Sequence, residues 1–174
     1  MKLYFARHGQ TQFNKDGLIT GQIDELLIEE GVKEAEETMK NMATDFTEIY
    51  SSDLLRCKQT AEILNKKLNL EIKYDKRLRE RNFGSIAGGK FQEIDPSGEM
   101  RRKDMDCIYS YREYGGESVD DVKNRLFSFI NEIKNKKSKI LIVTHGGIIR
   151  LLHNTINNQK HDHVKNSSIH EFEF

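Results

Sequence analysis

The hydrophobic pattern alternates between short apolar runs and longer helical stripes along most of the chain. Apolar or β-branched runs predict buried strands at residues 2–6, 46–50, 71–74 and 139–144. Apolar residues at helical spacing predict helices at residues 30–42, 54–68, 119–133 and 148–156. Residues 169–174 predict a final edge strand. Because strands and helices alternate, we expect a three-layer α/β/α sandwich with a mainly parallel central sheet.

The segments between these elements are less regular. Three polar or glycine-containing stretches predict loops: 12–29, 77–90 and 157–167. Residues 91–114 predict a helical insertion or lid, and its charged run Arg101–Asp104 predicts a solvated face. We therefore expect a single domain over residues 1–174, with a lid-like insertion at about 88–117.

Two helix starts carry polar residues that can bind free backbone N–H groups. Ser51–Asp53 follows the second predicted strand and offers hydroxyl and carboxylate caps. Ser118 and Asp121 have the spacing of a capping box before the apolar stripe that ends near residue 133. Both patterns favour helices that begin at these residues.

The composition narrows the class of protein. The chain has 174 residues, 36% of them hydrophobic, with 28 Lys and Arg against 28 Asp and Glu. A net charge of zero gives no support to a nucleic-acid or membrane-surface partner. Cys57 and Cys107 are scattered and suit a reducing cytosol, where each packs as a small apolar residue. The apolar run at 3–6 is too short for a signal peptide, so we expect a cytoplasmic protein.

Two predicted strands end in the same way, with a histidine followed by a glycine. These are His8-Gly9 after the first strand and His145-Gly146 after the clearest buried strand. The carboxyl ends of parallel strands lie on one edge of the sheet, so both histidines can face one crevice. Glycine permits close approach of backbone to a ligand, and the helix after Gly146 directs free N–H groups towards an anion.

Two arginines and a carboxylate can reach the same edge. Arg7 precedes His8, and Arg56 lies near the start of the helix that follows the second strand. Arginine matches phosphate oxygens in a bidentate fashion. Glu80, in the loop after the third strand, offers a proton donor. This set predicts phosphoryl transfer through a nucleophilic histidine, without a metal.

Six ordered motifs resemble the histidine phosphatase superfamily, in its phosphoglycerate mutase-like branch. They are Arg7-His8-Gly9-Gln10-Thr11 with Asn14; Gly21-Gln22 with Asp24; Ser51–Leu54 with Arg56, Gln59, Thr60 and Ala61; Leu78-Arg79-Glu80 with Phe83-Gly84; Gly115–Ser118; and Thr144–Gly147. The order of the motifs over residues 1–150 is far more specific than any one of them.

The resemblance implies a role for each matching residue. His8 would be the phosphorylated nucleophile and Glu80 the general acid and base. The phosphate pocket would be formed by Arg7, Arg56 and His145. Backbone and side chains that line the substrate site would be Gly9, Asn14, Thr20, Gly21 and Gly146. The resemblance implies a small phosphorylated substrate, a phosphoglycerate mutase-like fold, and no metal or organic cofactor.

Some positions depart from the family pattern and leave the substrate open. Leu26 and Ile28 replace a proline and a hydroxyl residue, and Ile86-Ala87 stands where Trp-Glu is frequent. Tyr114 replaces a frequent proline. None is a core catalytic position, but all flank the loop and lid expected to contact the leaving group.

Other polar residues have plainer interpretations. His153 is expected to have a packing or surface role. His161 and His163 have a spacing that can bind metal, but no third ligand is evident. Arg79 and Arg81 flank Glu80 as surface charges or as extensions of the anion site.

Three functions fit this sequence to different degrees. A phosphomonoesterase is favoured because the chain has little beyond the core fold. A bisphosphate-dependent phosphoglycerate mutase is the alternative among enzymes. A non-catalytic phosphate-binding or scaffold protein is the alternative of another class, and the complete set of catalytic residue types speaks against it. The strand at 169–174 could pair with a second copy in a homodimer.

Overall fold

A five-stranded mixed sheet forms the centre of the protein, whose computed structural model describes residues 1–161 and 163–174. The strand order is β3-β2-β4-β1-β5. The strands are β1 (Lys2–Arg7), β2 (Glu48–Ser51), β3 (Ile72–Tyr74), β4 (Ile140–Thr144) and β5 (Ile169–Glu173). Parallel pairing joins β3, β2, β4 and β1, whereas β5 runs antiparallel beside β1 at the edge. The predicted strands and the mainly parallel sheet are confirmed.

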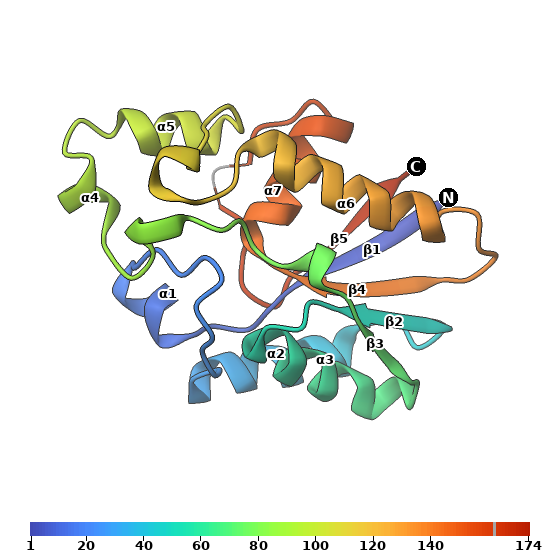
Figure 1. The fold of residues 1–174 in the computed structure, drawn as a ribbon. Helices are drawn as coiled ribbons and strands as arrows, with labels where there is room; N and C mark the ends of the chain where they lie inside the picture. The colour runs from blue at the N-terminus through green and yellow to red at the C-terminus, as the bar shows by residue number, and fades with distance from the viewer. Residues whose placement is uncertain (162) are drawn as a thin grey trace.

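Helices cover both faces of this sheet, which confirms the α/β/α sandwich. In Figure 1, α2 (Glu29–Asn41) and α3 (Leu55–Leu68) lie on one face, and α6 (Val119–Ile133) and α7 (Gly146–Ile156) lie on the other. Alternate residues of β4 pack on opposite faces of the sheet. Ile140 and Ile142 belong to one apolar cluster, and Leu141 and Val143 belong to the other. A strand buried on both faces needs this continuous apolar run.

The central pair β1 and β4 ends in register, and this places the two His-Gly turns side by side. Arg7 pairs with Thr144 at the end of the ladder, and the amide of His8 donates to the carbonyl of Thr144 at 3.0 Å. The next residue on each strand is a histidine. The register of β1 with β4 therefore places His8 and His145 next to each other at one edge of the sheet.

Helix capping agrees with the sequence at one site and differs at another. The Ser118 hydroxyl accepts from the amide of Asp121 at 3.2 Å, and Asp121 accepts from the amide of Ser118, so the capping box of α6 is confirmed. The cap expected at Ser51–Asp53 is wrong, because α3 begins at Leu55. Asp53 instead receives two hydrogen bonds of 2.6 Å from Arg79, a stronger, charge-assisted partner.

Two other helix boundaries differ from the sequence prediction. The loop predicted at 12–29 contains a short helix, α1 (Gln12–Asp16), which a capping box of Thr11 and Asn14 begins. Its single turn is too short to show periodicity. The last long helix, α7, starts at Gly146, earlier than predicted.

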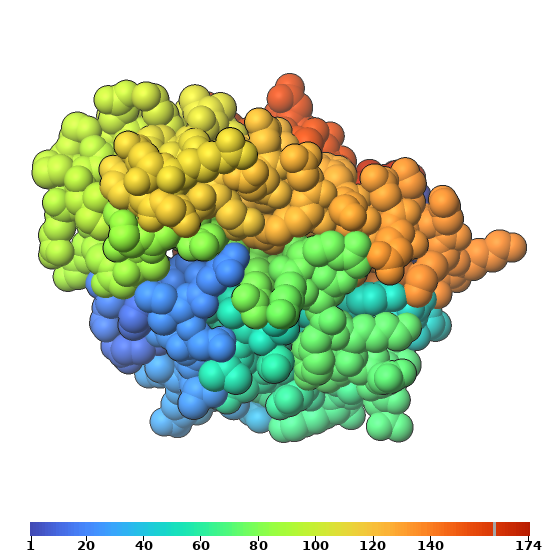
Figure 2. All heavy atoms as spheres, in the orientation of Figure 1, coloured from blue at the N-terminus to red at the C-terminus, as the bar shows by residue number. Residues whose placement is uncertain are grey.

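The segment at 88–117 forms a small layer beside the sheet. It contains α4 (Phe91–Ile94), α5 (Glu99–Met105) and the 3₁₀ turn η3 (Arg112–Tyr114), after the 3₁₀ turns η1 (Lys76–Leu78) and η2 (Gly84–Ile86). Figure 2 shows its yellow-green residues as a lobe above the blue residues near α1. Met100 and Tyr111 anchor the lobe in an apolar cluster with Phe83.

The charged run on α5 is only partly solvated. Arg101, Arg102 and Lys103 are exposed as expected, but Asp104 is 4% exposed. The prediction of a solvated face is therefore wrong for Asp104, which is paired with arginines from two other segments. Within residues 1–161 and 163–174, no helix is both long and apolar enough to cross a membrane.

Candidate active site

The side chain of His8 is held in one tautomer at the end of β1. His8 is 4% exposed, and its Nδ1 lies 2.7 Å from the carbonyl oxygen of Gly9. A carbonyl only accepts hydrogen bonds, so Nδ1 carries the proton and Nε2 keeps its lone pair. Burial and then the neighbouring guanidinium of Arg56 hold the pKa of His8 well below its ordinary value. The ring is therefore neutral at neutral pH and has a nucleophilic nitrogen.

His145 packs directly behind this ring. The two ring centroids lie 5.3 Å apart with the planes at 61°. His145 is fully buried, and its Nε2 is hydrogen-bonded to the hydroxyl of Ser52 at 2.9 Å. Burial, followed by the charge of Arg56, also lowers its pKa well below the ordinary value. His145 lies outside the lining of the cavity described below, so it contacts His8 rather than the open space.

Buried guanidinium groups give the site its positive charge. Arg56 is 1% exposed and is fixed by hydrogen bonds to the carbonyls of Gly21 (2.6 Å) and Ile23 (2.8 Å). Arg7 donates to the carbonyl of Val164, and burial lowers its pKa to about 10. In the described part of the chain, the buried Nε groups of Arg7 and Arg56 have no hydrogen-bond partner. Unpaired buried donors are costly, and an anion would satisfy them.

Glu80 is oriented by two backbone N–H groups. Its Oε1 accepts from the amide of Arg81 and its Oε2 accepts from the amide of Gly147, both at 3.0 Å. The Gly147 amide belongs to the first turn of α7. A Cβ at residue 147 would lie 2.4 Å from Oε1 of Glu80, so a larger residue would displace this carboxylate. The sequence predicted no individual role for Gly147.

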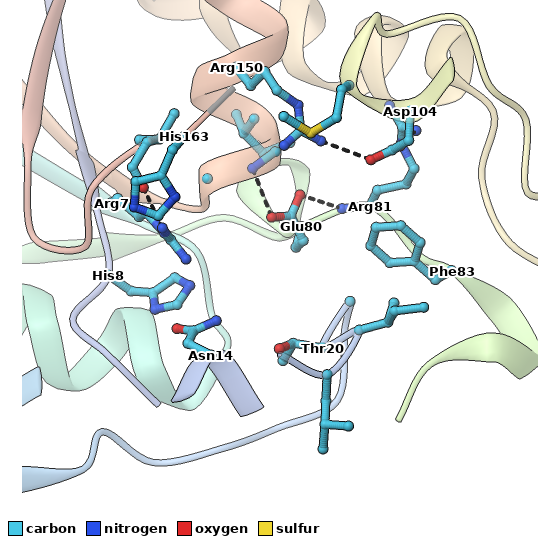
Figure 3. A pocket seen from close by; sticks show the side chains of 18 of the residues that line it. Arg7, His8, Asn14, Thr20, Glu80, Arg81, Phe83, Asp104, Arg150 and His163 are labelled. Atoms are coloured by element: carbon cyan, nitrogen blue, oxygen red, sulfur yellow. Dashed lines mark hydrogen bonds and ion pairs between the residues drawn. The ribbon is translucent and has the colours of Figure 1, made fainter. Parts of the chain in front are cut away.

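A cavity of about 240 Å³ brings most of the predicted site residues together. Its lining includes eight of them: Arg7, His8, Asn14, Thr20, Gly21, Arg56, Glu80 and Gly146. Figure 3 shows Arg7 and His8 on one side of this space and Glu80 across from them. Gly9 lies outside the lining, because its amide donates to Thr60 and its α-carbon packs against Gly31.

The cavity continues beyond these residues, into a part for which the sequence offered Arg81 as one of two alternatives and the lid as a contact of the leaving group, but no other named residue. The additional polar lining consists of Arg81, Arg101, Asp104, Arg150 and His163, and the apolar lining includes Leu18, Ile19, Phe83, Phe91 and Met105. Arg150 lies four residues after Gly146 on α7, a spacing that places both on one helix face. That spacing is the one signal that could have identified Arg150.

Asn166 is a second residue that sequence reasoning missed. Its side-chain amide donates to the carbonyl of His8 at 3.1 Å and to Oδ1 of Asn14 at 3.2 Å. It lies in the polar loop that also supplies the Val164 carbonyl to Arg7. No periodicity or motif marks this residue, because its contacts join segments at opposite ends of the chain.

The remaining histidines form a cluster at α7 and β5. His153 is buried and its Nε2 lies 2.9 Å from Nδ1 of His170, and His161 stacks on His153 at a centroid distance of 3.8 Å. Burial, then the charges of His161 and His170, lowers the pKa of His153 to about 4. Among residues 1–161 and 163–174, no three His, Cys, Asp or Glu side chains are grouped to hold a metal ion.

The chain matches the model of one protein family, and it is similar in sequence to a sugar bisphosphatase and to a phosphoglycerate mutase-like protein. The model of the histidine phosphatase superfamily (branch 1) matches residues 3–174. Fructose-2,6-bisphosphatase TIGAR of Xenopus tropicalis is 41% identical over 133 residues, which cover 73% of this chain and 47% of that protein. Phosphoglycerate mutase-like protein 4 of Arabidopsis thaliana is 32% identical over 185 residues, covering 98% of this chain and 78% of the relative.

Solved structures show the same fold. A mycobacterial glucosyl-3-phosphoglycerate phosphatase in complex with VO3 has a TM-score of 0.87 and 27% identity, covering 98% of this chain and 91% of that one. The chain thus spans about half the length of TIGAR and most of the length of the mycobacterial protein.

Proposed function

The chain belongs to the histidine phosphatase superfamily, branch 1, and from this premise we propose that it is a phosphomonoesterase that uses His8 as its nucleophile. The observation that carries the proposal is the state of the His8 ring. Its Nδ1 is bonded to the Gly9 carbonyl, and the neutral ring lies in the same cavity as the guanidinium groups of Arg7 and Arg56. A lone pair on Nε2 beside two cations suits attack on a phosphate ester.

The first step transfers the phosphoryl group to the protein. Nε2 of His8 attacks phosphorus, a P–N bond forms, and the ester P–O bond breaks. Arg7 and Arg56, which line the cavity with His8, donate to the phosphoryl oxygens. Protonated Glu80 gives its proton to the leaving oxygen, so that an alcohol departs.

The second step returns His8 to its starting state. A water molecule attacks the phosphohistidine, the P–N bond breaks, and Glu80 takes the proton of the water. The products are inorganic phosphate and the neutral imidazole. Because His145 packs against His8 and lies outside the cavity lining, we propose that it holds the His8 ring in place and keeps water away from that ring's rear.

The substrate is proposed to be a small phosphorylated metabolite. Asn14, Thr20, Gly21 and Gly146 line the inner cavity, where the phosphate would lie. Phe91, Asp104 and Met105 of the 88–117 segment line the outer part, where the alcohol portion would lie. Names of relatives point to phosphorylated sugars and sugar-linked phosphoglycerates, which supports this class.

A phosphoglycerate mutase is the second candidate. The relative called phosphoglycerate mutase-like protein 4 matches 98% of this chain. A mutase would use the same phosphohistidine but return the phosphoryl group to the substrate instead of to water.

Two measurements test the proposal. Phosphate release from a panel of sugar phosphates, phosphoglycerates, nucleoside 5′-phosphates and α-ribazole phosphate identifies hydrolysis. Incubation of 3-phosphoglycerate with and without 2,3-bisphosphoglycerate separates the activities: free phosphate supports a phosphatase, and primer-dependent 2-phosphoglycerate supports a mutase. Purified protein that neither releases phosphate nor forms an acid-labile phosphoenzyme on His8 would contradict both enzyme readings and favour a non-catalytic role.

A further inference from the structure

Asp104 lies between two arginines in the outer part of the active-site cavity. Its Oδ1 is 2.5 Å from Nη1 of Arg81, and its Oδ2 is 2.9 Å from Nη2 of Arg150. The three side chains come from α5, the loop after β3, and α7. Figure 3 shows the dashed contact from Arg150 to Asp104 at the side of the cavity opposite His8.

Burial of these three side chains reduces the screening of their charges by water and salt. The side chains of Asp104 and Arg81 are 6% and 7% exposed, and that of Arg150 is 18% exposed. All three line the same cavity as His8. Charges that are largely removed from water are screened little by salt, so each acts strongly on a bound molecule.

Without Asp104, two guanidinium groups would face the cavity beyond the phosphate pocket. Such a pair would be a strong site for a second anionic group on the substrate. The carboxylate of Asp104 takes one donor from each arginine and adds a negative charge at the position where that second anion would lie. Arg101 adds a further cation at the rim, but its side chain is exposed, and its Cζ lies over the Phe91 ring at 5.6 Å from the ring centroid. Solvent therefore weakens its contribution.

We infer that Asp104 is a specificity-determining residue that makes the site prefer phosphate monoesters of uncharged alcohols over those that carry a second anionic group. This inference rests on the proposed phosphatase function. The protein carboxylate engages one Nη group of each arginine, so a carboxylate or second phosphate of the substrate would have to compete with it for these donors. The apolar side chains of Phe83, Phe91 and Met105 line the same region and suit an uncharged alcohol portion.

The test uses two substrates of nearly the same size and shape. They are 4-carbamoylphenyl phosphate and 4-carboxyphenyl phosphate, which differ in the charge of one group. For the unaltered protein we expect kcat/KM for the carbamoyl compound to exceed that for the carboxy compound by about tenfold or more. This measurement does not depend on the folding of any variant. An equal rate, or a preference for the carboxy compound, overturns the inference.

The variant Asp104→Asn removes the charge and keeps the shape. We expect the ratio of the two kcat/KM values to move towards the carboxy compound by about 10- to 100-fold. Differences in leaving-group chemistry cancel, because the same two substrates are compared in both proteins. Asp104→Glu keeps the charge and serves as the matched control, with the preference for the carbamoyl compound retained.

The outcomes separate this inference from the function on which it rests. If the unaltered protein hydrolyses neither compound nor any other monoester, the phosphatase function fails and the inference fails with it. If it hydrolyses the carbamoyl compound and a folded Asp104→Asn protein shows the same ratio, Asp104 is only a structural link between α5 and the arginines. In that case the phosphatase function stands and the inference is wrong.

Discussion

The imidazole rings of His8 and His145 lie against each other, with centroids 5.3 Å apart, although one follows the first strand and the other the fourth. The pairing of Arg7 with Thr144 at the end of the β1–β4 ladder produces this contact. His145 is bonded to Ser52 and His8 to the Gly9 carbonyl, so both rings have fixed orientations.

Replacement of His8 by alanine is expected to abolish hydrolysis of p-nitrophenyl phosphate. Loss of the nucleophile should lower kcat by about 10³-fold or more, because the arginines alone cannot form the covalent intermediate. The matched control is His161→Gln, which changes a histidine outside the cavity lining. Turnover by a folded His8→Ala protein at a rate near that of the control would rule out the nucleophile assignment.

Replacement of Glu80 by glutamine is expected to slow substrates with poor leaving groups most. An alkyl phosphate needs a proton at its leaving oxygen, and its kcat should fall by about 10²–10⁴-fold. p-Nitrophenolate leaves without a proton, so its release should fall much less. A plot of log kcat against leaving-group pKa measures the difference. Equal losses for all substrates would argue that Glu80 only positions Gly147 and α7.

The stability of the protein is expected to fall as the pH drops below 6.5. The pKa of His8 and of His145 is lowered from 6.5 by burial and by Arg56, so the folded state stays unprotonated where the unfolded state takes up protons. Since the unfolded state binds more protons, the free energy of unfolding decreases by about 1.4 kcal/mol per pH unit for each such group. This loss of stability begins near pH 6.5, the pKa of histidine in the unfolded state, and continues down to the lowered pKa values of the two histidines in the folded state.

Urea denaturation at several pH values between about 7.5 and about 5 measures this slope. The variant His8→Asn should have a shallower slope, because one buried base is removed. An identical slope in the variant would show that His8 does not contribute to the pH dependence.

Replacement of Asn166 by alanine is expected to lower activity because it displaces His8 and Asn14, although Asn166 does not take part in the reaction. The variant loses the bonds to the His8 carbonyl and to Asn14, and both segments line or adjoin the cavity. We expect kcat to fall about tenfold while KM changes little, because misplacement of the nucleophile affects the reaction more than substrate binding. The unfolding free energy should fall by about 1–3 kcal/mol.

The matched control for this variant is Asn131→Ala, on the exposed face of α6. It should leave kcat, KM and stability nearly unchanged. If Asn166→Ala raises KM and leaves kcat unchanged, Asn166 acts on the bound substrate and not on the position of His8.

Local patterns were sufficient for the strands, the long helices and the layers. The apolar run at 140–144 identified β4, and the capping box at Ser118 fixed the start of α6. The same local reasoning failed at Asp53, which pairs with Arg79, and at Asp104, which pairs with Arg81 and Arg150. In each case the arginine that engages the carboxylate is distant in sequence, and local patterns do not reveal it.

The sequence by itself determined the sheet, the edge at which the site lies, and the residue types that meet there. These follow from hydrophobic periodicity and from the alternation of strands and helices, which are patterns along the chain. Only the tertiary structure decided that His145 lies behind His8, that Asn166 holds the end of β1, and that Asp104 shares the cavity with two arginines. Such contacts depend on how loops and helices from distant segments pack, and the burial of a charge is decided by the partner it finds there.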